Sequence, residues 1–165
     1  MTTTAQYLAN TLKTTLDYAD RVAADIPADQ FAHKPHPTIN HPAWLYGHLS
    51  TYPDKLLPMI GHEDLSKPNT RFVELFKAGT DCADDPSIYP SKDEIMAEFR
   101  SKHATILRVL PEVSDEILDR ENPWEPTKQV FPKVGHAVQF IFANHIMMHL
   151  GQASAWRRCV GLGPA

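Results

Sequence analysis

The sequence predicts an all-α four-helix bundle, and three observations support this prediction. Apolar residues recur every three or four positions in four long segments. Proline-rich connections separate these segments, and no stretch shows the convincing alternation of a β-strand. The length of 165 residues and the apolar fraction of 42% suit one hydrophobic core. We therefore predict a single helical domain over residues 1–165.

The first and third helices have clear start and stop signals. The first follows a threonine cluster that can cap its N-terminus, and it ends before Pro27. The third opens with a capping box formed by Ser91 and Glu94 and stops at Pro111. Two shorter helical turns are predicted at residues 70–78 and 114–118.

The second helix is predicted to open at residues 40–41, with Pro42 in its first turn, and to run to about Gly61. Pro53 lies inside it. Because proline has no backbone N–H, Pro53 should bend the helix just after His48.

The fourth helix is predicted to start near Pro132 or Lys133 and to end at Gly161 or Gly163. The segment before it, residues 122–132, holds three prolines and is predicted to be irregular. One side of the fourth helix carries a stripe at intervals of three or four, formed by Val134, Val138, Ile141, His145, Met148, His149, Gln152 and Trp156.

His145 and His149 lie four residues apart on this stripe, which places both imidazoles on the core face of the helix. Nine histidines in a chain of this length give roughly 0.5 such pairs by chance, so the spacing needs a structural context. Two imidazoles rarely complete a metal site, and a third ligand must come from another helix.

Histidines outside the last helix are the candidates for that third ligand. His48 is the best placed, because Trp44 and Tyr52 lie four residues before and after it on the same helical face. His103, on the apolar stripe of the third helix, is its main competitor, although a hydrogen-bonded core histidine is the simpler interpretation. The remaining candidates, His41 and His62, lie at the ends of the second helix.

Charge and composition exclude several partners. The net charge of −4 and the scattered lysines and arginines predict no nucleic-acid or anionic membrane surface. Residues 1–5 lack the features of a secretion signal, and no apolar run spans a bilayer, so we expect a cytoplasmic protein. Cys82 and Cys159 are expected to be reduced thiols, and Cys159 lies too far along the last helix to share a metal with His149.

Three segments together resemble the DinB family, which includes the YfiT-like metal-dependent hydrolases. They are Ile26–Phe31, Trp44–Leu49 with its Gly-His-Leu turn, and His145–Gln152 with its His-x-x-x-His-x-Gly-Gln pattern. The resemblance implies a four-helix bundle with a long crossover connection and short extra helices, and a homodimer. It also implies a divalent metal ion held by His48, His145 and His149, with zinc or nickel favoured and iron compatible.

The resemblance favours an enzyme of the thiol S-transferase type, acting on a small molecule with a low-molecular-weight thiol at an open three-histidine site. A metal-dependent hydrolase and a non-catalytic, stress-associated metal-binding bundle are the alternatives.

Gln152 either orients a metal ligand or packs within its helix. Trp44, Tyr52 and Trp156 are expected to be core residues. No catalytic acid or base is identified, and surface carboxylates are expected at Asp54, Glu74, Glu121 and Glu125.

Overall fold

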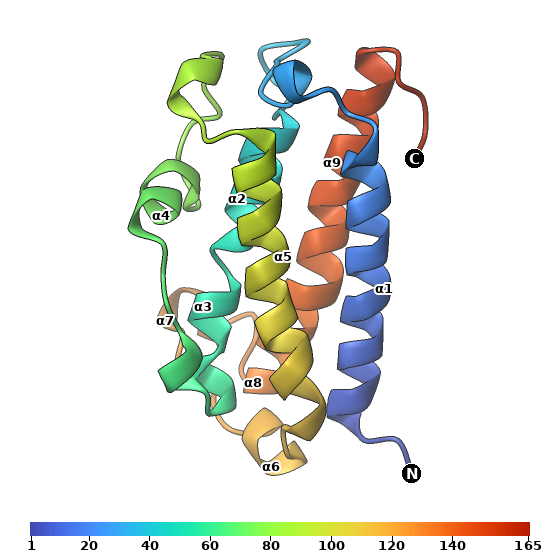
Figure 1. The fold of residues 1–165 in the computed structure, drawn as a ribbon. Coiled ribbons are helices and arrows are strands. Elements are labelled where there is room, and N and C mark those ends of the chain that lie inside the picture. The colour runs from blue at the N-terminus through green and yellow to red at the C-terminus, as the bar shows by residue number, and fades with distance from the viewer.

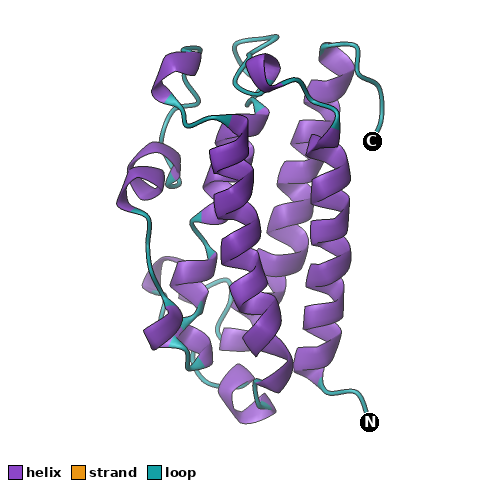
Figure 2. Cartoon of the chain, viewed as in Figure 1, coloured by secondary structure: helices purple, strands orange, loops and turns teal.

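The computed structural model describes residues 1–165, which form helices joined by loops and turns, with no β-strand (Figure 2). Four rods make up the bundle: α1 (Thr4–Ala24); α2 (Pro42–Ser50) followed by α3 (Pro53–Leu56); α5 (Lys92–Val109); and α8 (Val134–Gln139) followed by α9 (Ile146–Cys159). The shorter helices are α4 (Thr70–Phe76), α6 (Asp115–Leu118) and α7 (Glu125–Lys128). The all-α prediction is confirmed.

The chain direction shows a long crossover between α3 and α5. In Figure 1, α1 and α9 run one way along the bundle, whereas α2 and α5 both run the other way. Residues 57–91, which include α4, therefore return the chain to the end of the bundle from which α2 started. α2 packs against α4, α5 and α9, so a side chain on its inner face can meet the last helix.

Local capping explains where the long helices begin. Thr3 and Gln6 form a capping box at α1, and Ser91 and Glu94 form the predicted one at α5. His41 caps α2, because its Nδ1 accepts a hydrogen bond of 3.1 Å from the backbone N–H of Trp44.

The second rod is broken at Pro53 rather than only bent. α2 ends at Ser50, and α3 starts at Pro53. The Thr51 hydroxyl donates to the His48 carbonyl at 2.8 Å, which satisfies an acceptor at the break. A 3₁₀ turn follows and ends at Gly61, whose φ of 89° favours glycine.

Two predictions about regular structure were wrong near the C-terminal rod. The proline-rich segment 122–132 contains the single helical turn α7, with Pro126 at its start, where a missing N–H costs nothing. The last rod is also not a continuous α-helix, because Phe140–His145 forms a π-helical turn between α8 and α9.

The π-turn changes which residues of α9 face the core. It carries one more residue than an α-turn, and the inward-facing stripe after it extends to positions one further along the chain, while His149 and Trp156 stay buried. Met148 and Gln152, predicted on the buried stripe, are exposed. Three of their neighbours take core positions instead: Ile146, Leu150 and Ala153.

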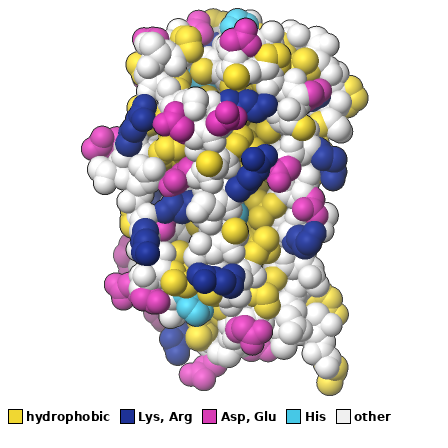
Figure 3. Space-filling view, in the orientation of Figure 1, with side chains coloured by type: hydrophobic (Ala, Val, Ile, Leu, Met, Phe, Trp, Pro, Cys, Tyr) yellow, Lys and Arg dark blue, Asp and Glu magenta, His cyan; other side chains and the backbone are white.

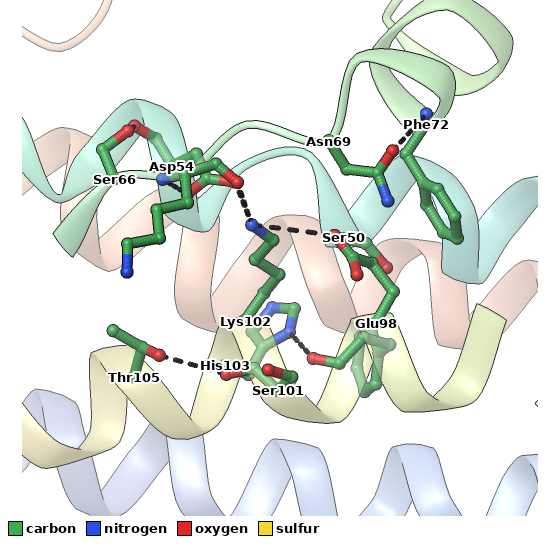
Figure 4. Close-up of polar contacts among 12 residues, drawn as sticks. Ser50, Asp54, Ser66, Asn69, Phe72, Glu98, Ser101, Lys102, His103 and Thr105 are labelled. Carbon is green, nitrogen blue, oxygen red and sulfur yellow. Dashed lines mark hydrogen bonds and ion pairs between the residues drawn. The ribbon is translucent and has the colours of Figure 1, made fainter. Parts of the chain in front are cut away.

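Asp54 is buried, which contradicts the prediction of a surface carboxylate. Figure 4 shows Lys102 of α5 reaching Asp54 of α3, with Nζ 2.8 Å from the carboxylate. Lys102 also lies 3.6 Å from Glu98 on its own helix. This ion pair joins α3 to α5, and Asp54 is therefore already engaged in a structural contact.

The surface carries both signs of charge. On the face formed by α1 and α5, basic and acidic side chains are interspersed rather than separated (Figure 3). None of the helices combines the length and the apolar character needed to span a membrane.

Candidate metal centre

Three buried histidines from two rods converge at the centre of the bundle. His48 comes from α2, His145 ends the π-turn, and His149 lies one turn later in α9. One ring nitrogen from each lies within 4.8 Å of the other two. The ring centres are 4.6 to 5.3 Å apart. The packing of α2 on α9 thus brings together residues almost 100 positions apart in the sequence.

Hydrogen bonds at the outer ring nitrogens orient two of the three histidines. His48 Nδ1–H donates to the Phe76 carbonyl at 2.7 Å, and His149 Nδ1–H donates to Gln152 Oε1 at 3.3 Å. With the proton on Nδ1, each of these rings carries its lone pair on Nε2, the atom that would bind an ion; His149 Nε2 lies 3.1 Å from His145 Nε2. Gln152 therefore contacts a candidate metal ligand, which agrees with its predicted role of orienting a ligand.

Burial keeps the three imidazoles neutral at physiological pH. It lowers the pKa of His48 to about 4 and the pKa of His145 to about 3. Burial likewise lowers the pKa of His149, although the hydrogen bond to Gln152 opposes this shift. A neutral imidazole is the form that binds a metal ion, so no proton has to be removed near pH 7.

The donor set fits a divalent ion. Ideal tetrahedral coordination by imidazoles separates the ligand nitrogens by ~3.3 Å. The Nε2 atoms of His145 and His149 lie 3.1 Å apart. His145 Nδ1 is buried and has no hydrogen-bond partner, so no bond to the protein orients this ring as the Nδ1 bonds orient His48 and His149. No cysteine, aspartate or glutamate joins the group, which leaves further coordination positions free of protein ligands.

Aromatic side chains form the walls around the three histidines. Trp44 stacks on His48 with ring centres 4.7 Å apart, and the Tyr52 ring centre lies 4.5 Å from that of His145. Both side chains are buried as predicted, but they border the site rather than a distant part of the core. Trp156 is fully buried, and its indole N–H binds the His33 carbonyl.

Gly47 allows α4 to approach α2 closely enough to orient His48. A Cβ atom added at Gly47 would lie 2.5 Å from the buried Phe76 ring. We expect Gly47→Ala to destabilise the protein by about 1–3 kcal/mol, because the ring must move and the carbonyl that binds His48 moves with it. Urea unfolding measures this loss. Gly151→Ala is the matched control, since nothing lies within 4 Å of a Cβ at that exposed helical position. An equal loss in both variants would contradict the close-approach explanation.

The other histidines considered from the sequence lie outside the group. His103 is a core histidine, with Nδ1 2.8 Å from the Phe99 carbonyl, as the simpler interpretation held. His41 is buried at the N-terminus of α2, where Nε2 lies 3.2 Å from the Ala83 carbonyl. His62 lies in the turn after α3, and His136 is exposed on α8.

Two contributors to the site were missed from the sequence. The Phe76 carbonyl orients His48, but a backbone acceptor leaves no signal in the sequence. Lys55 lies above the Tyr52 ring, and its position depends on the break at Pro53. The cysteines, as predicted, are free, and neither belongs to the histidine group.

Comparison with known proteins identifies the family. A family model described as the DinB superfamily matches residues 11–153, which begin within α1 and include all three histidines. A search of curated proteins found no match. Since the matched region covers most of the 165 residues and the fold is the helical bundle that the resemblance implied, the chain belongs to the DinB superfamily.

Proposed function

We propose that the protein is a metal-dependent enzyme of the thiol S-transferase type. His48, His145 and His149 hold one divalent ion through Nε2, and a low-molecular-weight thiol binds beside them. The observation that supports this proposal is the buried histidine group itself, in which two rings are oriented through Nδ1 and no fourth protein ligand closes the site.

No carboxylate joins the histidine group to act as a general base, so the ion itself would have to activate the nucleophile; the resemblance to the DinB family favours a thiol over water in this role. Asp54 is engaged by Lys102, and Glu121 and Glu125 are exposed beside Lys128. A divalent ion lowers the pKa of a thiol that binds it, so the thiol needs no separate base. In the overall reaction the thiol releases its proton, its sulfur forms a new bond to an electrophilic carbon, and the leaving group departs with the electron pair.

The residues around the histidines hold the reactants and limit access of water. Trp44 and Tyr52 cover two of the rings with apolar surface, which strengthens electrostatic interactions inside the site. Phe76 and Gln152 fix the orientation of His48 and His149. Together these contacts organise the site before the substrate arrives.

Titration of the cobalt(II)-substituted protein with 2-mercaptoethanol tests this function. We expect a near-ultraviolet sulfur-to-cobalt charge-transfer band that saturates with the thiol and does not form with ethylene glycol, a sulfur-free analogue of similar size. The band should be lost in His145→Ala and kept in His136→Ala, which changes an exposed histidine of the same rod. If neither this thiol nor others produce a band, thiol transfer is wrong and hydrolysis or metal storage becomes the better explanation.

A further inference from the structure

Lys55 is the one half-buried lysine that has no partner for its charge. Six lysines are half-buried. Five of them form ion pairs or donate hydrogen bonds to backbone carbonyls, namely Lys34, Lys92, Lys102, Lys128 and Lys133. Lys102 shows the usual arrangement, in which Nζ is held by a carboxylate (Figure 4). A cation without a counter-ion in such a position can accept an anion from solution.

Two aromatic rings hold the Lys55 ammonium beside the histidines. Its Nζ lies 4.8 Å from the centre of the Tyr52 ring and 5.3 Å from the centre of the Trp124 ring. The same Tyr52 ring has its centre 4.5 Å from that of His145. The distance from Nζ to the His145 ring centre therefore cannot exceed the sum of 4.8 and 4.5 Å.

The charges around this point all favour a negative ligand. The three histidines are neutral, and no carboxylate belongs to their group, so an ion bound there keeps its full positive charge. The positive charge of Lys55 is close enough to contribute to the lowered pKa values of His48 and His145. With an ion bound, a small anion at the histidines would be attracted both by that ion and by the Lys55 ammonium.

We propose that Lys55 is a specificity-determining residue that binds a carboxylate or similar anionic group of the substrate or thiol. The inference rests on the proposed function, because it assigns the second contact of a molecule whose sulfur lies beside the histidines. The upper limit on the distance between Lys55 Nζ and the His145 ring centre is compatible with a sulfur and a carboxylate joined by two or three carbons. Tyr52 and Trp124 hold the ammonium in place for this contact.

Two thiols that differ in charge test the inference on the cobalt(II) protein. We expect Lys55→Met to weaken binding of 3-mercaptopropionate about 10-fold, because a charge-assisted hydrogen bond is lost. Binding of the neutral 2-mercaptoethanol should change less than about 2-fold. Lys55→Arg should restore most of the preference for the anion. Lys13→Met, which removes the same charge from an exposed position on α1, is the matched control.

The outcomes separate this inference from the proposed function. Cobalt stoichiometry and thermal unfolding establish that each variant is folded and loaded. Equal weakening of both thiols, or no weakening of either, in Lys55→Met overturns the role of Lys55 and leaves thiol binding intact. Binding of azide, an anion without sulfur, to the cobalt(II) protein and to Lys55→Met is the last measurement. If no thiol binds but azide binding still depends on Lys55, the proposed thiol transfer is wrong and the anion-binding role of Lys55 is retained. If no thiol binds and azide binding is also independent of Lys55, both the proposed function and the role of Lys55 are wrong.

Discussion

Replacing His149 with alanine is expected to reduce bound metal from about one ion per chain to less than about a tenth, because a site with two remaining imidazoles binds weakly. His145→Ala should have the same effect, since the Nε2 atoms of the two rings lie 3.1 Å apart and serve one ion. Elemental analysis of protein purified without added metal measures the change.

Two histidines outside the group provide the controls for this experiment. His136→Ala changes an exposed ring in the same rod, and His103→Gln changes a core ring bonded to the Phe99 carbonyl. Both variants should keep their metal. Full metal content in His145→Ala and His149→Ala would contradict the site, and loss in His103→Gln would mean that the third ligand was assigned wrongly.

The metal-free protein is expected to lose several kcal/mol of its unfolding free energy between about pH 6.5 and pH 4. The reason is the set of buried histidines. Burial lowers the pKa of His41, His48 and His103 to about 4 and that of His145 to about 3, and it also lowers the pKa of His149. In the unfolded chain these groups titrate near 6.5.

The sign follows from proton uptake. Between pH 6.5 and pH 4 the unfolded chain binds more protons than the folded protein, so stability falls as the pH falls, by up to about 1.4 kcal/mol per pH unit for each histidine. Above pH 6.5 the stabilisation is fully present. Urea unfolding followed by circular dichroism at pH 7.5, 6 and 5 measures this dependence.

A buried histidine away from the candidate site gives the matched variant. His103→Phe removes one titrating group from the core, so its stability should depend less steeply on pH, by about one proton. His136→Ala removes an exposed histidine and should keep the original slope. Equal unfolding free energies at pH 7.5 and pH 5 in the unaltered protein would contradict the account of the buried imidazoles.

The parts of the fold that depend on local chemistry could be predicted from the sequence. The capping box of Ser91 and Glu94 and the proline at the start of α2 gave correct helix starts, because caps act within a few residues. The histidine spacing of one helical turn, together with the flanking Trp44 and Tyr52, placed His48 opposite the pair correctly.

The parts that depend on tertiary packing could not be predicted. The π-turn over Phe140–His145 was not predicted, and Met148, which follows it, was wrongly placed in the core, whereas His149 was placed there correctly. The sequence around Asp54 does not distinguish it from an exposed helix residue, because its burial depends on the contact with Lys102 of α5. The Phe76 carbonyl is positioned by the crossover, whose path the local pattern does not specify.

In anomalous diffraction from a crystal soaked in zinc, we expect one strong peak about 2.0–2.1 Å from one nitrogen each of His48, His145 and His149, with any further ligand supplied by solvent or by a small molecule. A peak that excludes one of these three histidines, or one that has a fourth protein ligand, would contradict the open three-histidine centre.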